Sequence, residues 1–368
     1  MESVARACDL LLAFHHEGEV LRLRDLVSRT GLNPATALRL MTTLEQRGLV
    51  ERIRKNQYRS NVKPIARCRY RLGYGSQGED ASFSQEWSES IVRVAAEQHI
   101  DLLALNNEFD SETALRNVDR FIHEKVDLVI EHQFNEQIAP IISSKLLEAG
   151  IPLIAMGTAH PGATYYGGNN YGAGLIGGRY LGRWARKWWK EADELILLEL
   201  SMAGPLLQSR LTGVEVGVKE MFPGMPVLHL KGTAQFGDTL ELVRKHLHQT
   251  KSRRILVGAV NDPCALGALR AFEESGLVEN GAIMGQGGSA EGRAELRRKG
   301  TRLVGTVAFF PEKYGEHIIS LALDILNKKP VPPAVFVEHQ LLTPANVDHY
   351  YPNDLLTSPL RQTAALHF

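Results

Sequence analysis

The sequence has few cysteines, no long apolar run and no excess of charge, and each shortage excludes a class of protein. Its 368 residues include only three cysteines, Cys8, Cys68 and Cys264, and none is in a CxxC or Cys/His spacing. Reduced thiols are therefore expected, without a disulfide framework or a structural zinc site. No apolar run approaches the roughly 18 residues of a membrane-spanning helix, and the first residues lack a signal-peptide layout. We expect a cytoplasmic protein without a membrane segment.

The formal net charge is zero, with 42 basic and 42 acidic residues, but the charges are unevenly distributed. Residues 1–68 hold 12 Lys or Arg against 7 Asp or Glu, which leaves 30 against 35 in the other 300 residues. The N-terminal part is thus +5 and the remainder −5. This asymmetry is typical of a protein in which only one part meets a polyphosphate such as DNA.

The most informative stretch is Gly31–Val50. Asn33 is a good N-cap, Pro34 suits the first helical turn, and apolar residues then recur at helical spacing. The opposite face carries small, hydroxyl and guanidinium side chains, which suit close approach to bases and phosphates. A strand, a basic turn and a second strand follow up to residue 62, so the order is that of a winged helix-turn-helix. A small helical subdomain that docks protein is the alternative. The residues predicted to bind DNA are Asn33, Ala35, Thr36, Leu38, Arg39, Thr42, Thr43, Arg54 and Lys55.

The same stretch carries a family pattern, in Gly31-Leu32, Thr36, Arg39-Leu40-Met41, Thr43-Leu44-Glu45 and Arg47-Gly48-Leu49-Val50. With this pattern, residues 3–62 resemble the IclR-type winged-helix domain, which implies operator DNA as a partner. The sequence departs from the pattern at Leu38, where a polar residue is common. The chain beyond this domain does not look like the usual IclR effector domain.

From Tyr70 onward, short apolar strands alternate with helices of 10–15 residues. Examples of the expected strands are 100–105, 126–130, 195–200 and 254–257. This alternation indicates parallel sheets with helices on both faces. About 270 residues of it exceed one compact mononucleotide fold, so two lobes are predicted. Ligands of such sheets bind on the loops at the carboxyl ends of strands.

The loops at the predicted strand ends carry amides, a carboxylate, an arginine and aromatic rings. Planar polar groups can form paired hydrogen bonds with hydroxyls, and aromatic rings can stack on the apolar face of a sugar. The combination predicts a site for a neutral polyol. The predicted ligand-binding residues are Ser76, Asp80, Phe83, Gln133, Phe134, Asn169, Asn170, Arg210, Asp262 and Gln286.

Two motifs in this part are specific. Asn261-Asp262 in NDPCALGALRAF fits the signature ND-x-x-AxGAxxA, and Arg210 opens an R-x-x-G helix start. With these motifs, residues 70–345 resemble the type I periplasmic sugar-binding fold, as in ribose-binding protein and the sensor domains of LacI-family repressors. The resemblance implies that Asp262 and Arg210 bind sugar hydroxyls, with Phe83 as the aromatic stacker and Asp80 as a polar contact beside it.

The sequence also departs from this family. Gly157-Thr158 stands where an acidic residue is common, Phe309-Phe310 where a glutamine is common, and Gln286 where an aspartate is common. We therefore expect a pocket that is less acidic and more aromatic than a ribose site. Asn169-Asn170 resembles the family's D-N-x-x-x-G start of the second lobe.

One other motif indicates a cofactor that we do not expect. Gly172–Gly177 is a formal GxGxxG match, but that fingerprint must leave a strand directly, and an acid should end the next strand about 20 residues on. Residues 167–171 do not look like a strand, and Glu191, Asp193 and Glu194 precede the next one. Glycines that open a tightly packed helix are the preferred interpretation. No cofactor, metal site or catalytic set is predicted, because no histidine falls into HExxH or a nucleophile–base layout.

The sequence thus predicts an α/β fold: an N-terminal winged helix-turn-helix followed by a two-lobed, parallel-sheet, periplasmic-binding-protein-like domain. The expected parts are the DNA-binding domain 1–62, a linker 63–69, the ligand-binding domain 70–350 and a C-terminal tail 351–368. Within the ligand-binding domain, lobe 1 should hold 70–166 and 306–332, and lobe 2 should hold 167–305 and 333–350.

The predicted function is a sugar-responsive transcription regulator in which ligand closure of the lobes changes operator affinity. Its expected partners are operator DNA, a sugar or polyol effector and a second copy of the chain, because one short helix and a wing bury too little for tight specific binding. The alternative is an α/β enzyme that acts on a sugar or nucleotide and carries a DNA-binding appendage.

Overall fold

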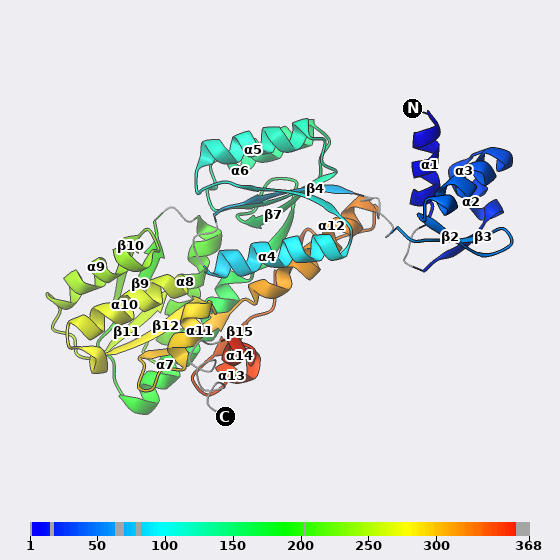
Figure 1. The fold of residues 1–368 in the computed structure, drawn as a ribbon. Helices are drawn as coiled ribbons and strands as arrows, with labels where there is room; N and C mark the ends of the chain where they lie inside the picture. The colour runs from blue at the N-terminus through cyan, green and yellow to red at the C-terminus, as the bar shows by residue number, and fades with distance from the viewer. Residues whose placement is uncertain (1, 15–17, 63–69, 79–81, 202–203, 358–368) are drawn as a thin grey trace, which may run out of the picture. The chain divides into compact units, whose positions relative to one another are not determined.

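The computed structural model describes residues 2–14, 18–62, 70–78, 82–201 and 204–357. The chain divides into two compact units, one of residues 1–70 with the short segment 98–101, and one of the remaining residues (Figure 1). We call the first the N-terminal domain and the second the two-lobed domain. The predicted linker 63–69 and the predicted site residue Asp80 lie outside the described residues.

In its described residues, the N-terminal domain has three helices and a small antiparallel sheet of strand order β1-β3-β2. The first strand, β1, was not predicted, because three residues carry no recognisable pattern of their own. The predicted helix-turn-helix and wing are confirmed. The elements are α1 (Glu2–Leu12), β1 (Val20–Arg22), α2 (Leu23–Thr30), α3 (Pro34–Gln46), β2 (Val50–Arg54) and β3 (Gln57–Ser60).

The start of α3 follows from local chemistry. The Asn33 side chain accepts a hydrogen bond from the Ala35 amide at 2.9 Å, and Pro34 occupies the first turn. Ala37, Met41 and Leu44 are the buried residues of this helix. Their spacing leaves the opposite face of α3 to solvent.

Lobe 1 is a six-stranded sheet of order β14-β8-β7-β6-β4-β5. Helices α5 and α6 cover one face and α4 and α12 the other (Figure 1). The central strand β6 is buried along its whole length: its first half, 128–130, is apolar, and its second half places Glu131, His132 and Gln133 in the interior. The elements are β4 (Arg71–Ser76), α4 (Ser82–Glu97), β5 (Asp101–Asn106), α5 (Ser111–His123), β6 (Leu128–Gln133), α6 (Ala139–Glu148), β7 (Leu153–Gly157), β8 (Thr164–Gly168), α12 (Tyr314–Leu326) and β14 (Ala334–Val337).

Lobe 2 is a second six-stranded sheet, of order β10-β9-β11-β12-β13-β15, in which β15 is antiparallel to β13. Its apolar core is a single cluster that extends from α7 to the C-terminal helices. The elements are α7 (Asn170–Trp188), β9 (Glu194–Leu200), α8 (Pro205–Lys219), β10 (Val227–Gly232), α9 (Phe236–Leu247), β11 (Ile255–Ala259), α10 (Asp262–Glu274), η1 (Val278–Asn280), β12 (Gly281–Gly287), α11 (Ala290–Leu296), β13 (Leu303–Ala308), η2 (Pro311–Lys313), β15 (Gln340–Leu342), α13 (Val347–Tyr350) and α14 (Asp354–Thr357).

The chain crosses between the lobes three times, after β8, after β13 and after β14. Two expected boundaries were therefore wrong. Residues 306–308 belong to β13 of lobe 2, and residues 334–337 form β14 of lobe 1, where Ala334 is aligned with Tyr165 of β8. A four-residue strand whose partner lies about 170 positions earlier gives no local sign of which sheet it joins.

The expected C-terminal tail is also wrong where the structure describes it. Tyr351 is buried in the lobe 2 core, and its ring stacks on Phe310 at 5.8 Å between centroids. Residues 354–357 then form α14. Residues 358–368 lie outside the described part.

Of the GxGxxG match, Gly174 lies at a close contact between α7 and α8, and Gly177 lies against Met284 and Gln286 of β12. A Cβ on Gly174 would lie 1.8 Å from the Arg210 carbonyl oxygen, and one on Gly178 would lie 2.2 Å from the Val214 carbonyl oxygen. On the other helix, Gly213 and Gly217 face the α7 backbone in the same way. Close packing therefore accounts for Gly174 and Gly177, as expected, whereas a Cβ on Gly172 would lie nearest the Asn169 side chain, at 3.0 Å. The prediction that residues 167–171 are not a strand was wrong for 167–168, which end β8, and only Asn169 separates that strand from α7.

Candidate functional site

A cavity of about 280 Å³ lies between the two lobes. Its lining comes from the carboxyl ends of strands in both sheets. From lobe 1 these include Gln77 after β4 and Gln133 at the end of β6, and from lobe 2 Val260 after β11 and Gly287 at the end of β12. This volume is near the lower end of the roughly 300–1,000 Å³ common for small-molecule sites. The cavity therefore suits a small ligand.

Asp262 is the acidic group of the lobe 2 wall. It starts α10 directly after β11, is only 1% exposed, and is preceded by the N-cap Asn261. Its Oδ1 accepts a hydrogen bond from the Thr306 hydroxyl and its Oδ2 from the Ser289 amide, both at 2.6 Å. Burial raises the pKa of Asp262, whereas these hydrogen bonds oppose the rise. The positive end of α10 also favours a carboxylate at this position.

Arg210, on α8, is the basic group of the same wall. Its Nε and Nη2 donate to Asn170 Oδ1 at 3.1 and 2.7 Å, and its Nη1 donates to the Val260 carbonyl at 2.6 Å. The guanidinium also lies over the Phe309 ring, 4.5 Å from its centroid. Burial lowers the pKa of Arg210 to about 10, so it stays protonated at neutral pH. With Asp262 it makes a wall of balanced charge.

The lobe 1 side is rich in aromatic rings. Phe83 and Trp87 lie one turn apart on α4 and meet edge to face at 6.0 Å between centroids. Trp87 stacks on His132 at 4.2 Å and contacts the edge of Tyr314 at 4.9 Å. Burial lowers the pKa of His132 to about 3, so this ring is neutral at pH 7. Phe83, Trp87 and Tyr314 present apolar surface to the cavity.

Three polar atoms of cavity residues are buried and have no hydrogen-bond partner within the described part of the chain. They are Gln133 Nε2, Gln286 Oε1 and Trp87 Nε1. A buried polar group without a partner costs about 1–3 kcal/mol. Two donors and one acceptor of this kind are therefore groups that a hydroxyl-bearing ligand would satisfy.

The free face of α3 is the candidate DNA-binding face. Asn33, Ala35, Leu38, Arg39 and Thr43 are exposed, and Thr36 and Thr42 are partly exposed. Two of the predicted DNA-contacting residues, Thr42 and Thr43, use their hydroxyl hydrogens within the helix itself. The hydroxyls of Thr42 and Thr43 donate to the carbonyls of Leu38 and Arg39 in their own helix, at 2.9 and 3.1 Å. In this conformation they can offer methyl groups and lone pairs, but no donor for phosphate oxygens.

A groove beside the start of α3 adds basic residues that were not predicted. It is lined by Arg22, Arg24, Pro34, Lys55 and Asn56 among others. Arg54 and Lys55 are exposed at the wing turn, as expected. Arg22 is the N-cap residue before α2, and Arg24 is the second residue of that helix. A count of basic residues around the helix-turn-helix could have found both.

The comparisons with known proteins agree with this geometry. A family model described as a periplasmic binding protein domain matches residues 75–330. The chain belongs to this family. A second model, the IclR helix-turn-helix domain, matches residues 3–54. No curated protein is significantly similar in sequence to the chain.

Solved periplasmic-binding-protein structures share the fold. One is a solute-binding protein of an ABC transporter from Actinobacillus succinogenes 130z with bound D-allose, at TM-score 0.68 and 19% identity, covering 77% of this chain and all of that one. A Bacillus halodurans C-125 solute-binding protein with bound myo-inositol gives 0.69 and 21%, covering 78% and 98%. A Mycobacterium smegmatis protein in complex with β-D-fucofuranose gives 0.70 and 20%, covering 78% and 95%.

Most residues predicted for the ligand site line the cavity of the periplasmic-binding-protein domain. Ser76 and Asn169 do not. The Ser76 side chain is buried outside the lining, and Asn169 caps α7 by accepting a hydrogen bond from the Gly172 amide at 2.9 Å. Ser76 is the last residue of β4, and the next residue, Gln77, reaches the cavity instead. The predicted residues in the lining are Phe83, Gln133, Phe134, Asn170, Arg210, Asp262 and Gln286.

Several cavity residues of this periplasmic-binding-protein domain were missed. Trp87 had a usable signal, since it lies four positions after Phe83 on one helix face. Tyr165 was missed with the strand that carries it, and Tyr314 belongs to the crossover after β13 and has no motif around it. The missed lining residues with polar or aromatic side chains are Gln77, Ser84, Trp87, Phe109, Ser111, Asn135, Tyr165, Thr233, Gln235, Asn261, Ser289, Phe309 and Tyr314.

For the described residues, the other possibilities are a metal site, a membrane-spanning helix and a reactive thiol. No three His, Cys, Asp or Glu side chains within them are grouped as a metal site requires. No helix among them is long and apolar enough to cross a membrane. Cys264, beside Asp262 in sequence, is buried, and burial raises the pKa of its thiol to about 12.

Proposed function

We propose that this protein is a cytoplasmic, sugar-responsive regulator of transcription. In this proposal the N-terminal domain binds operator DNA, and the cavity of the two-lobed domain binds a neutral sugar or polyol. Ligand binding to both lobes then changes operator affinity. The single observation that carries the ligand proposal is the set of unpartnered polar atoms on Gln133, Gln286 and Trp87, within a wall of aromatic rings.

The charges of the cavity support a neutral ligand over a sugar acid or phosphate. One protonated arginine, Arg210, and one carboxyl group, Asp262, line the same lobe 2 wall of the cavity. An anionic ligand would leave an excess of negative charge in a buried site. A polyol can instead accept from the guanidinium and donate to the carboxylate. Several similar structures hold neutral compounds of this kind: D-allose, myo-inositol and, in a solute-binding protein from Agrobacterium vitis, allitol.

The switch is proposed to act through lobe closure. A ligand that touches both lobes has a higher affinity for the closed form, and only such a difference can shift the equilibrium. The chain enters lobe 1 from the N-terminal domain through residues 63–69. A change between lobes can therefore reach paired DNA-binding domains in a homodimer, which a winged helix needs for tight binding.

The first test is a ligand screen by thermal unfolding of the full chain with D-allose, allitol and myo-inositol as starting probes. A ligand at about 100 times its dissociation constant adds roughly 2.7 kcal/mol of stability. All four tryptophans lie in the two-lobed domain, so their fluorescence reports that domain. If neutral sugars and polyols all fail while a sugar acid or phosphate stabilises the protein, the proposed ligand class is wrong.

The second test links the cavity to DNA. Asp262→Asn keeps the shape of the side chain but removes its charge, so the best ligand of the screen should bind about tenfold to a hundredfold more weakly. Asp119→Asn, at an exposed position on α5, is the matched control. Binding to a DNA sequence selected in vitro is then measured against ligand concentration. The response of Asp262→Asn should need more ligand, whereas its DNA affinity without ligand should match wild type.

A further inference from the structure

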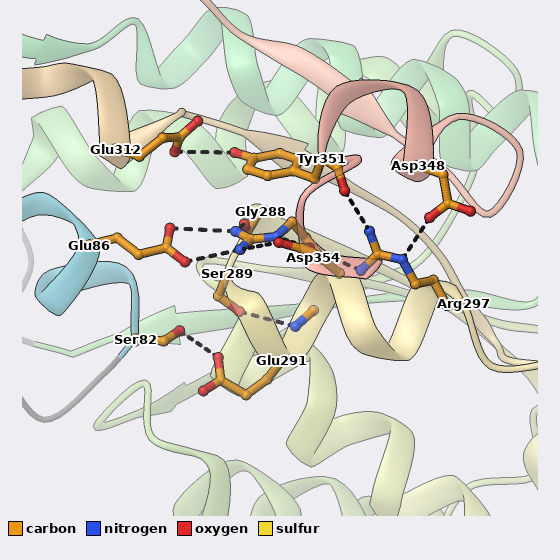
Figure 2. A network of polar contacts seen from close by, with 12 residues as sticks. Ser82, Glu86, Gly288, Ser289, Glu291, Arg297, Glu312, Asp348, Tyr351 and Asp354 are labelled. Carbon is orange, nitrogen blue, oxygen red and sulfur yellow. Dashed lines mark hydrogen bonds and ion pairs between the residues drawn. The ribbon is translucent and has the colours of Figure 1, made fainter. Parts of the chain in front are cut away.

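Two side-chain contacts join α4 of lobe 1 to α11 of lobe 2 outside the cavity (Figure 2). Ser82 Oγ donates to Glu291 Oε2 at 2.6 Å. Arg293 Nη2 donates to Glu86 Oε1 at 3.0 Å, with Nη1 at 3.4 Å from Glu86 Oε2. Both contacts link residues more than 200 positions apart, so they exist only while the two lobes lie against each other.

Arg293 is held firmly on the lobe 2 side. Its Nε and Nη2 donate to the Asp354 carboxylate at 2.8 and 3.2 Å, and its Nη1 donates to the Gly288 carbonyl at 2.7 Å. Its guanidinium lies over the Tyr351 ring, 4.0 Å from the centroid. The residue is only 5% exposed. Glu86 is thus its single lobe 1 partner in this network.

The C-terminal segment is part of the same network. Arg297, one turn after Arg293, donates to Asp348 Oδ1 at 2.7 Å and to Asp354 Oδ2 at 3.0 Å. The Tyr351 hydroxyl donates to Glu312 Oε2 at 3.4 Å, at the crossover after β13. Figure 2 shows Asp348, Tyr351 and Asp354 around Arg297, and Glu312 beside Tyr351. The C-terminal helices therefore fix the guanidinium that lobe 1 contacts.

The network adjoins the cavity, because both use residues of α4 and of the turn at Gly288–Ser289. Glu86 shares α4 with the cavity residues Phe83 and Trp87. On the other side, the Gly288–Ser289 turn holds both groups, since Arg293 binds the Gly288 carbonyl and Asp262 binds the Ser289 amide. A ligand that binds Asp262 therefore acts on the same turn of lobe 2 as the contact between Arg293 and Glu86.

We propose that Glu86 and Arg293 form a latch that favours the closed form of the two-lobed domain, and that the C-terminal helix α14 sets its strength through Asp354. Opening breaks the Glu86 contact but leaves Arg293 paired with Asp354. Opening therefore does not leave a buried charge without a partner, which would be strongly unfavourable. The latch shifts the balance between open and closed lobes without locking it.

The test measures the distance between lobes in the full chain without ligand or DNA. Spin labels are placed on cysteines at the exposed positions Glu112 of α5 and Lys245 of α9. Cys8 and Cys68 are replaced by serine, and Cys264 is buried. Because the readout needs no ligand, its result is independent of the proposed effector.

Glu86→Gln should lower the ratio of closed to open lobes by about tenfold, the worth of one charge-assisted hydrogen bond. Asp354→Asn should shift the distances the other way, toward the closed form, because opening would then leave the buried Arg293 without a carboxylate partner. Glu89→Gln is the control, since Glu89 is exposed on the same helix and has no ion pair among the described residues. A Glu86→Gln distance distribution identical to wild type and Glu89→Gln overturns the latch. An unchanged distribution for Asp354→Asn overturns the role of α14.

Discussion

The contact between α7 and α8 offers a sharp test of why this chain carries a GxGxxG motif. Gly174 is buried, and an added Cβ would lie 1.8 Å from the Arg210 carbonyl oxygen and 3.1 Å from the Val214 amide nitrogen. These are backbone atoms, so no side-chain rotation relieves the clash. Gly174→Ala must push the two helices apart.

Inserting a methyl group into a packed core typically costs about 1–3 kcal/mol, and a clash with backbone belongs at the upper end. We expect Gly174→Ala to lose about 3 kcal/mol of unfolding free energy, which corresponds to a fall in melting temperature of about 6–12 °C. Since α8 carries Arg210, ligand binding should weaken as well. Tryptophan fluorescence reports the unfolding of the two-lobed domain.

Gly237→Ala is the matched control. Gly237 lies in α9 with no heavy atom within 4 Å of an added Cβ, so alanine there should be neutral or stabilising by up to about 1 kcal/mol. Gly178→Ala, at the same contact one turn later, should behave like Gly174→Ala. If Gly174→Ala is as stable as wild type, close packing does not explain the glycines, and titration with NAD then becomes the decisive measurement.

Two further predictions concern α3, which we call the reading helix because it is the proposed DNA-binding helix, and a buried carboxyl group. Arg39→Ala should weaken binding to the selected DNA by about 1–3 kcal/mol if Arg39 reads a base; equal affinity in a fluorescence anisotropy titration would contradict the assignment of α3. Glu131, fully buried beside Asn107, has a pKa raised well above 4.5 by burial. Its contribution to stability is therefore present below pH 4.5 and lost as pH rises. Glu131→Gln should then raise the melting temperature at pH 7 but not at pH 4, and an equal gain at both would refute a titrating Glu131. His132, whose lowered pKa gives the opposite slope, is common to both proteins and cancels in the comparison.

The N-terminal domain and the motif-bearing loops could be predicted from sequence because their determinants are local. Asn33 caps α3 by a bond to the amide two residues on, and the buried face of α3 follows from helical spacing alone. Asp262 reaches the cavity because it directly follows a buried strand and starts a helix. Such residues need only their neighbours in sequence to be placed.

The errors concern residues whose position depends on distant partners. Ser76 is part of β4 and is buried outside the cavity, and because side chains on a strand alternate between faces, the next residue, Gln77, reaches the cavity. Tyr314 and Tyr165 reach the cavity only because the chain crosses between lobes around them. No local pattern carries that information.

Sequence alone therefore determined the two kinds of domain, the reading helix and the acidic and basic groups of the cavity. Tertiary structure decided which sheet β14 joins, which aromatic rings close the site, and that Asp354 pairs with Arg293 rather than belonging to a free tail. The physical reason is the separation of the partners. Hydrogen bonds and ring contacts between segments 60 to more than 200 positions apart depend on where both sheets and the three crossovers place those segments, which no local pattern records.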